Sequence, residues 1–518
     1  MSKFGVLLTA SLVSSLITLD SNIVAVALPT IGRSLHASFT SLQWVISAYV
    51  LAYSALLLAA GSYADLNGRR RAMLIGLLVF AVGSTMCGVA PSVTVLNLAR
   101  ALQGVGGALL LTASLAIVSH DFPGEQRAGA FAFWGAAIGI ALAIGPIVGG
   151  VITKLIGWRW IFFVNLPLCA VLIAATIRTV EESKDPAARQ LDLRGIATFS
   201  VGLGVLIWAL IDSNEDGWTS GSILVRIVVA ILSFSAFVVV EIRQTRPMVD
   251  LGLFRRRTFL GSVLTMIGYG ASAQVMVFFL PIFLQNAYGF EPILAGFAML
   301  PFAMPMVLAP RITSGLATRI SGRALLTSGL LLTFVANVLY WQMAREQFPY
   351  QIFVVAMMVA GCGAGVLNGQ TVKVLGSSVP ADRAGMASGL ASTTRFIGIL
   401  VSVAGLGAVL GHVVSATFLR SARAAGLDGT AADAAAKLVT SGNVLQMLGQ
   451  VPPDMREVLH TAGLSSFAHG FAAASLVAAI VALVAAVLTF VLISPVDTAP
   501  SSPLEKRPCK FIDCRDPL

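Results

Sequence analysis

The stretch SLITLDSNIVAVALP, residues 15–29, places an acidic side chain inside an otherwise apolar segment. The apolar run around it, residues 5–28, is long enough to cross a hydrocarbon core of roughly 30 Å. An ionisable group at such depth is costly, and it is usually kept for a function. The sequence therefore predicts a transmembrane helix in which the carboxylate of Asp20 has a functional role.

The composition of the whole chain is that of a membrane protein. Of its 518 residues, 57% are hydrophobic and 11% are charged, whereas soluble domains carry about 25% charged residues. Apolar windows of about 20 residues occur about fourteen times. They are residues 5–28, 42–63, 72–91, 93–118, 128–153, 160–178, 193–212, 221–240, 259–284, 292–312, 324–343, 351–374, 385–411 and 467–493. We predict an all-α integral membrane bundle, because backbone exposed to lipid must satisfy its own hydrogen bonds and the alternating pattern of a β-barrel is absent.

The positive charges indicate the orientation of this bundle. Short connections on one side collect most of the Lys and Arg residues, including residues 69–71 and 255–257. Connections on the other side hold few: Arg33, Lys154, Arg159, Arg226 and Arg345. Basic residues favour the cytoplasmic side, so we expect both termini in the cytoplasm and a location in a bacterial inner membrane. The net charge of +10 then gives no reason to expect nucleic acid as a partner, because no soluble basic face exists.

Two pairs of segments repeat along the chain at nearly the same distance. Residues 61–69 resemble residues 315–323, and residues 123–129 resemble residues 380–385. The two offsets, roughly 254 and 256 residues, predict two parallel six-helix halves. We expect an N-terminal half at 1–178, connectors with two inserted helices at 179–258, and a C-terminal half at 259–493. The latter includes an outer loop at 412–465, with short interfacial helices in its Ala-rich parts, and a disordered cytoplasmic tail follows at 494–518.

Asp20 and Arg100 are predicted to lie at the same depth. At 1.5 Å per residue, Asp20 lies about 22 Å from the inner edge of an outward-running helix, and Arg100 about 10 Å below the outer edge of an inward-running one. Two buried opposite charges at one level are expected to pair. The pair is either a fixed lock between two helices or a proton-coupling site. In a proton-coupling site, burial favours the neutral form of the Asp20 carboxyl and Arg100 favours its charged form.

Five stretches resemble motifs of the drug:proton antiporter branch of the major facilitator superfamily, whose members have fourteen transmembrane segments. They are residues 19–29, 61–71, 96–107, 145–150 and 158–167. This resemblance implies proton transfer at Arg100 and an antiporter motif in the fifth helix, formed by Gly145, Pro146, Gly149 and Gly150. The sequence departs from the family pattern in having Asn22 where Thr is usual and Ala141 where Gly is frequent.

Two of these motifs also have a physical interpretation of their own. Glycines at 61 and 68 permit a tight turn, and the charges beside them can latch one face of the protein in one state and separate in another. The predicted latch consists of Gly61, Asp65, Gly68, Arg69 and Arg70, and the alternative is a solvated basic loop. The helix-5 glycines permit close helix contact, either as a hinge or as simple tight packing.

Six further polar residues are candidates for a substrate cavity. They are Asn22, Tyr49, Tyr53, Gln103, Gln274 and Arg395. Tyr49 and Tyr53 share a helix face that can offer aromatic surface to a cation. Arg395 lies deep in its helix with no acid predicted nearby, which leaves a structural role or an anion-binding role.

The sequence lacks the marks of the competing classes of function. A Walker A motif, an HExxH motif and a nucleophile elbow are all missing, so neither ATP hydrolysis nor enzyme activity is supported. We predict a proton-coupled antiporter that exports drug-like amphipathic or cationic molecules by alternating access. The alternative is an exporter of an anionic or endogenous metabolite. We expect neither a metal nor a cofactor. The expected partners are small-molecule substrates, protons and membrane lipid, and any periplasmic partners are unknown. We expect the protein to function as a monomer.

Overall fold

The regular secondary structure of the described part of the chain is entirely helical. The computed structural model describes residues 3–122, 125–184, 192–244, 251–379, 384–427 and 429–498, and none of these forms a strand. Within them, 14 helical segments are long and apolar enough to cross a membrane. This confirms the predicted all-α membrane bundle and its number of spans.

The helices fall into three groups along the chain. The first group contains α1 (Lys3–Leu35), α2 (Phe39–Asn67), α3 (Arg69–Gly88), α4 (Val93–Asp121), α5 (Glu125–Leu155), α6 (Trp160–Phe163) and α7 (Asn165–Thr179). The second is the pair α8 (Leu193–Asp216) and α9 (Gly221–Arg243). The third contains α10 (Arg257–Tyr269), α11 (Met276–Asn286), α12 (Pro292–Ala298), α13 (Leu300–Leu316), α14 (Gly322–Arg345), α15 (Tyr350–Ser377), α16 (Ala384–Ala424), α17 (Gly429–Thr440), α18 (Val444–Gln450) and α19 (Arg456–Leu492). A π-helical turn, Gly270–Gln274, joins α10 to α11.

Serine residues begin several of these helices. At each of them the serine hydroxyl accepts a hydrogen bond from the backbone N–H three residues further on. The four serines are Ser38, Ser92, Ser220 and Ser321. Such a cap satisfies a backbone donor that has no partner inside the helix. The beginnings of α2, α4, α9 and α14 are therefore set locally by the sequence.

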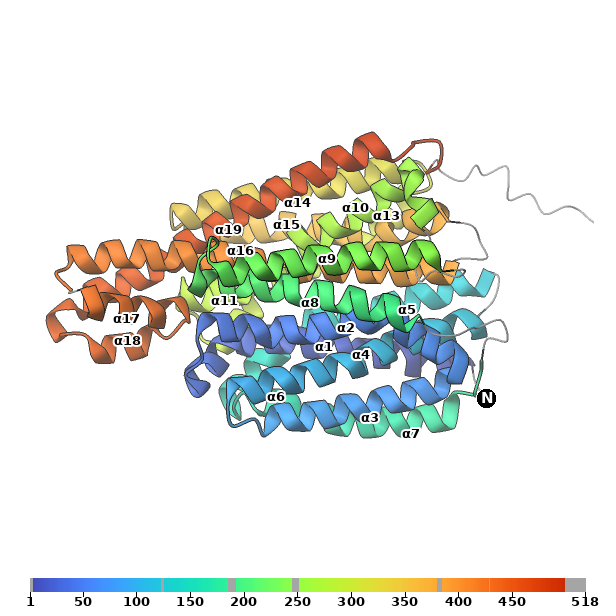
Figure 1. Ribbon diagram of the computed structural model, residues 1–518, viewed down its shortest axis with the longest axis horizontal. Helices are drawn as coiled ribbons and strands as arrows, with labels where there is room; N and C mark the ends of the chain where they lie inside the picture. Colours follow the sequence, from blue (N-terminus) through green and yellow to red (C-terminus); the bar gives the residue numbers. More distant parts are fainter. Residues whose placement is uncertain are drawn as a thin grey trace, which may run out of the picture.

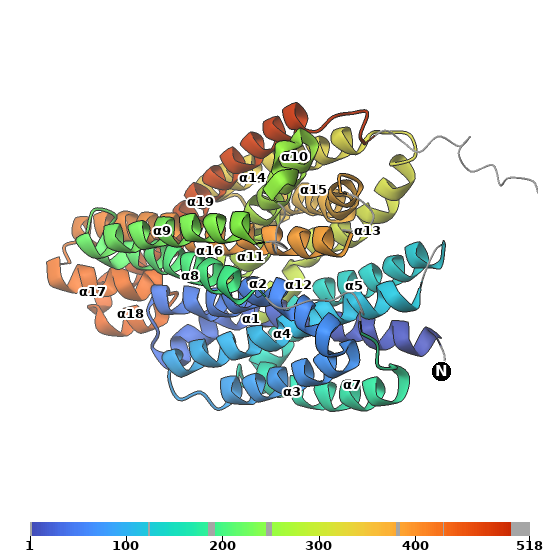
Figure 2. The same cartoon turned by 45° about the vertical axis from the view of Figure 1, so that its right-hand side comes forward.

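The first and third groups form two bundles that lie side by side (Figures 1 and 2). Helices α2, α5 and α1 of the first bundle contact α16, α12 and α11 of the second. The pair α8 and α9 packs together and contacts both bundles through α2 and α16. The predicted domain boundaries and the repeat relation between the halves stay predictions.

The glycines of α5 bring its backbone against two other helices. A β-carbon on Gly149 would lie 2.9 Å from the carbonyl oxygen of Ile23 on α1. One on Gly150 would lie 2.4 Å from the carbonyl oxygen of Pro292 on α12, and one on Gly296 would lie 2.4 Å from that of Pro146. The contact between α5 and α12 is thus reciprocal. It joins the two bundles through backbone surfaces that tolerate no side chain.

We therefore expect Gly150→Ala to destabilise the protein by about 1–3 kcal/mol, the usual cost of overpacking. Gly135→Ala on the same helix is the matched control, because no atom lies within 4 Å of the β-carbon that it would gain. Alanine is the better helix former, so the control is expected to be neutral or stabilising. Thermal unfolding of the two purified variants measures the difference, and equal melting temperatures would contradict the close contact.

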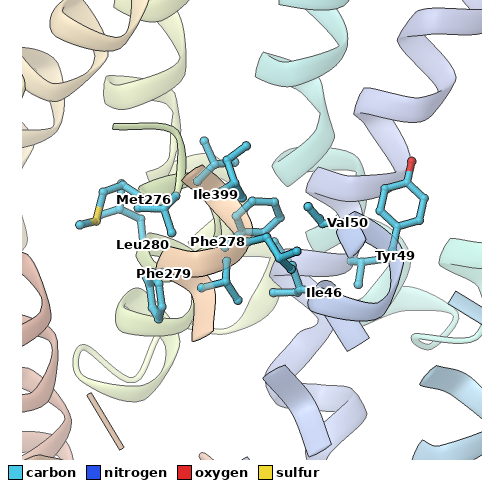
Figure 3. Packing of buried hydrophobic residues seen from close by; sticks show 14 of the residues in the cluster. Ile46, Tyr49, Val50, Met276, Phe278, Phe279, Leu280 and Ile399 are labelled. Atoms are coloured by element: carbon cyan, nitrogen blue, oxygen red, sulfur yellow. The ribbon is translucent and has the colours of Figure 1, made fainter. Parts of the chain in front are cut away.

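The two bundles are closed against each other near the end that carries α17 and α18. The side-chain amide of Gln43 donates to the carbonyl oxygen of Val403 at 3.2 Å, and that of Gln285 donates to Val26 at 2.8 Å. Figure 3 shows Phe278 of α11 against Ile46 of α2 in the apolar layer between the bundles. The cavity left there is about 30 Å³, which is enough for ordered water only.

The helices diverge toward the opposite end, where the N-terminus lies (Figure 2). Gly135 of α5 and Gly315 of α13 face open space at that end. The aromatic contact between Tyr53 and Phe396, with ring centroids 4.5 Å apart, lies between these regions and joins α2 to α16. The conformation is therefore closed on the α17–α18 side and spread on the side of the N-terminus.

Two of the predicted non-helical segments are wrong in part. Residues 412–465 are not a loop, because α16 continues to Ala424, α19 begins at Arg456, and α17 and α18 lie between them. The expected short helices in the Ala-rich part are present as α17. The tail begins with ordered residues, since Asp497 accepts a hydrogen bond from Thr258 at 2.5 Å and Thr498 accepts one from the N–H of Gly322 at 2.9 Å. Residues 499–518 lie outside the described part of the chain.

Candidate functional site

The carboxylate of Asp20 is held by three side chains inside the first bundle. Its Oδ2 accepts from the guanidinium of Arg100 at 2.6 Å, and its Oδ1 accepts from the side-chain amides of Gln103 and Asn165, each at 2.8 Å. Asp20 is 0% exposed and Arg100 is 1% exposed. The predicted pairing of Asp20 with Arg100 is therefore present, and it belongs to a network that joins α1, α4 and α7.

A second layer fixes these partners. The hydroxyl of Ser84 on α3 accepts from Gln103 at 3.1 Å and from Asn165 at 2.9 Å, and it donates to the carbonyl oxygen of Phe162 at 3.1 Å. The Arg100 guanidinium donates through Nε to the carbonyl oxygen of Val45 at 3.2 Å. It also lies 4.2 Å from the ring centroid of Tyr49. The guanidinium of Arg100 thus contacts a carboxylate, a carbonyl oxygen and an aromatic face.

Small residues on α3 and α4 allow this network to form. Arg100 and Gln103 are three residues apart, so they lie on one face of α4. A β-carbon on Gly104 would lie 2.4 Å from the carbonyl oxygen of Tyr49, and one on Gly83 would lie 2.8 Å from the backbone nitrogen of Gln103. Helices α2 and α3 therefore approach α4 closely enough for the short side chain of Ser84 to reach Gln103.

The hydrogen-bond pattern around Asp20 fits a carboxylate. All three neighbours donate to it, and the amide orientation of Gln103 is fixed because its oxygen accepts from Arg100 at 2.7 Å. A carboxylic acid would need an acceptor for its own proton, and these donors offer none in this arrangement. Protonation of Asp20 would therefore break at least one of these bonds and leave Arg100 without its counter-charge.

Asn165 and Ser84 are site residues that the sequence analysis did not select. Asn165 lies within the stretch 158–167 that carried one of the motif resemblances, at the start of α7. A polar amide at the beginning of an apolar span was the only available signal. Ser84 has no such signal, because single serines in membrane helices usually bond to their own backbone.

We expect Asn165→Ala to weaken transport without unfolding the protein. It removes one charge-assisted hydrogen bond from Asp20, which is worth about 1.5–3 kcal/mol, while Arg100 and Gln103 keep their contacts. The initial transport rate in proteoliposomes is the useful measurement, because the lost donor contacts the carboxylate that is expected to couple transport to protons. Ser15→Ala, at a hydroxyl that bonds only its own helix, is the control. A wild-type transport rate for Asn165→Ala would contradict this role.

Four of the six predicted cavity residues belong to packed regions instead. Asn22 donates to the carbonyl oxygen of Thr18 at 2.7 Å, and its β-carbon faces Gly145. Gln103 is part of the Asp20 network. Tyr49 is buried and points away from the interface between the bundles (Figure 3), and Tyr53 is buried against Phe396. Helical spacing gives the residues that share a face but not the neighbour that the face meets in each conformation, so the assignment of these four residues to a substrate cavity stays a prediction.

The other two, Gln274 and Arg395, lie in a polar region of the second bundle. The Nε of Arg395, the Oε1 of Gln274 and the hydroxyl of Tyr269 are buried without hydrogen-bond partners among the described residues. The π-helical turn places Gly270 against the carbonyl oxygen of Arg395, where a β-carbon would lie at 2.2 Å. Arg395 also forms no ion pair within the described part of the chain, and its guanidinium lies 4.9 Å from the ring of Phe396.

The residues of the predicted latch form contacts between α2, α3 and the segment after α7 in this conformation, while their role as a latch stays a prediction. Gly68 has φ of 117°, which only glycine adopts readily. Arg69 pairs with Asp65 at 3.0 Å. Glu182, which follows α7, accepts from the N–H groups of Arg70 and Arg71 at 3.1 Å each. Glu182 thus stabilises the N-terminus of α3, as expected for an acid at that end of a helix. No motif of the sequence includes Glu182.

Residues 10–403 match the family described as Major Facilitator Superfamily. Over 403 residues the chain is 37% identical to the multidrug resistance protein Stp of Mycobacterium tuberculosis, which covers 78% of this chain and 75% of that protein. It is 30% identical over 509 residues to the tetracenomycin C resistance and export protein of Streptomyces glaucescens, covering 96% and 91% of the two chains. It is 31% identical over 474 residues to the multidrug efflux pump LfrA of Mycolicibacterium smegmatis, covering 91% and 92%.

Solved structures share the fold at low sequence identity. A bacterial homologue of the human lysosomal transporter Spinster, in an inward-facing and unoccupied conformation, superposes with a TM-score of 0.61 at 16% identity, covering 96% of this chain and 98% of that one. The peptide transporter POT in complex with sulfate gives 0.60 at 15% identity, covering 95% and 97%. With the fold, the spans and the family match in agreement, the chain belongs to the major facilitator superfamily and is a multi-pass membrane transporter, not an enzyme.

Proposed function

We propose that this transporter exports drug-like amphipathic or cationic molecules in exchange for protons. The names of its relatives, multidrug resistance and efflux proteins, support drug export. The buried carboxylate in the first bundle supports proton coupling. We place the protein in a bacterial inner membrane with both termini in the cytoplasm, on the distribution of its basic residues, and we expect it to work as a monomer without a cofactor.

In this orientation the described conformation faces the cytoplasm. The side that carries α17 and α18 is then the outer side, where the bundles are closed, and the side of the N-terminus is the inner side, where they diverge. Asp20 is paired with Arg100 in this state, which corresponds to the state after proton release. Export follows when substrate binds from the cytoplasm and the bundles rock to open outward, where Asp20 takes up a proton.

The observation that carries this proposal is the position of Asp20 on α1. The same helix contacts the second bundle a short distance away, where the carbonyl oxygen of Val26 accepts from Gln285 of α11. The backbone of Ile23 also lies against Gly149 of α5, the helix that meets α12. A change of charge at Asp20 therefore acts on α1, which contacts both α11 of the second bundle and α5 of its own bundle.

A susceptibility panel tests the exported class of molecule. The chain is expressed in an efflux-deficient host, and growth is measured against cationic dyes, amphipathic antibiotics and anionic compounds, with and without a protonophore. We expect resistance to cationic or amphipathic compounds that disappears when the proton gradient is collapsed. Resistance that survives the protonophore would contradict proton coupling, and resistance to none of the compounds would contradict drug export.

A second candidate is the export of an anionic metabolite. The guanidinium of Arg395, with its buried Nε that has no hydrogen-bond partner among the described residues, favours a ligand that carries hydrogen-bond acceptors. Under this alternative, Arg395→Ala lowers export of anionic substrates about tenfold or more, as for a lost charge-assisted contact, and spares cationic ones. Equal effects on both classes would indicate a structural role.

A further inference from the structure

A large cavity lies in the second bundle, at the end where α10 begins and α19 ends, away from the Asp20 network. Its volume is about 590 Å³, which is within the range of ligand-binding pockets. It is an open cavity lined by the beginnings of α10 and α14 and by the ends of α15 and α19, at one end of the bundle (Figure 1). The function proposed above makes no use of this cavity.

Positive charge converges on the cavity from two helices. Arg256 and Arg257 line it at the start of α10, and Arg323 lines it at the start of α14. The hydroxyl-bearing Ser377 and Ser378, which end α15, complete the polar wall. Only one acid faces these groups among the described residues, and this residue, Asp497, already accepts a hydrogen bond from Thr258 at 2.5 Å.

The three arginines have no ion-pair partner in the described part of the chain. Arg323 stacks on the ring of Phe490 at 3.8 Å, which orients its guanidinium without neutralising it. Basic residues at the inner ends of helices are expected from the positive-inside rule alone. That rule, however, does not require three of them to line the same cavity together with two hydroxyl groups.

The remaining wall of the cavity is apolar and continues into the lipid-facing surface. Val491 lines the cavity and belongs to a stripe on α19 with Ile480, Val484 and Val487. These four side chains are between 52% and 67% exposed, and their spacing places them on one face of the helix. The surface is thus polar and cationic at the cavity and apolar along about 16 Å of helix beyond it, at 1.5 Å per residue.

We propose that this cavity binds the phosphate of an anionic phospholipid, whose acyl chains lie along the exposed stripe of α19. The guanidinium groups of the three arginines neutralise the phosphate and donate hydrogen bonds to its oxygens. The adjoining apolar stripe favours a lipid over free phosphate, because free phosphate gains nothing from it. A lipid bound at this site contacts the inner ends of α10, α14 and α19, so the packing of these ends depends on the lipid composition of the membrane.

Native mass spectrometry of the purified full-length protein tests this site. The probes are phosphatidylglycerol, zwitterionic phosphatidylcholine with the same acyl chains, and inorganic phosphate. We expect preferential retention of phosphatidylglycerol, reduced about tenfold in the double variant Arg257→Gln/Arg323→Gln, since each basic residue near anionic lipid contributes to binding. Arg319→Gln is the matched control, because Arg319 is exposed at the same end of the bundle and does not line the cavity.

Three results would overturn the proposal. They are equal retention of the two lipids, an equal loss in the Arg319→Gln control, and displacement of phosphatidylglycerol by inorganic phosphate, which would show a free-anion site. If the double variant does not fold, the wild-type protein is labelled with phosphatidylglycerol that carries a photoreactive acyl chain. Labelling concentrated on residues 480–495 supports the site, and labelling spread evenly over the lipid-facing helices contradicts it.

Discussion

Asp20→Asn is expected to abolish export driven by a pH gradient while leaving the protein folded. The amide keeps the size of the carboxylate and can still accept from Gln103 or Asn165, but it cannot exchange a proton. Arg100 then keeps its hydrogen bond to the carbonyl oxygen of Val45 and its aromatic contact with Tyr49. The measurement is substrate accumulation in proteoliposomes with an imposed pH gradient, with equal amounts of the wild type and the variant incorporated.

Asp212→Asn is the control for this experiment. Asp212 also pairs with an arginine, Arg226, at 2.8 Å, but it lies on α8 outside both bundles and is 24% exposed. Its substitution is expected to leave gradient-driven export within about twofold of the wild type, because a partly exposed ion pair contributes little. Undiminished export by Asp20→Asn would remove Asp20 from the coupling mechanism.

Arg100→Ala is expected to destabilise the protein by about 3–5 kcal/mol, since it leaves a buried carboxylate without its counter-charge. The double variant Asp20→Asn/Arg100→Ala is expected to recover part of this loss, because the remaining groups are neutral. Thermal unfolding of the two single variants and the double variant gives the coupling energy of the pair. Arg226→Ala serves as the control and should cost below about 1 kcal/mol.

Additive effects of the two substitutions would contradict a direct interaction between Asp20 and Arg100. A strongly coupled cycle, by contrast, is the result expected for two groups with 0% and 2% of their side-chain surface exposed and 2.6 Å between their atoms. The cycle and the transport assay of Asp20→Asn together separate the fixed-lock interpretation from the proton-coupling one. A lock predicts only the loss of stability, whereas coupling predicts that Asp20→Asn is stable and fails in transport.

The sequence could predict the pair of buried charges because helix rise is constant. Counting residues from each end of two apolar segments places Asp20 and Arg100 at one depth without any knowledge of packing. Counting could not find Asn165 or Ser84, since their contribution depends on how α7 and α3 are rotated toward α4. The same limit explains why Asn22 and Tyr49 were assigned to a cavity although both are packed inside the first bundle.

The sequence also predicted the membrane spans more reliably than the segments between them. Apolar windows mark only the part of a helix that lies in lipid, so they could not show that α16 continues to Ala424 or that α19 begins at Arg456. The π-helical turn at Gly270–Gln274 has no pattern of its own in the sequence. It results from the close approach of Gly270 to the backbone of Arg395, a contact between residues far apart in the chain.

Proton release on substrate binding tests the role of Asp20 most directly. The purified wild-type protein and Asp20→Asn are titrated, in weakly buffered solution with a pH indicator, with the compound to which expression confers the greatest resistance. We predict that binding releases protons from the wild type in a limited pH range, and that Asp20→Asn binds the compound without releasing any. Equal proton release from both proteins would contradict the assignment of Asp20 as the proton-coupling group.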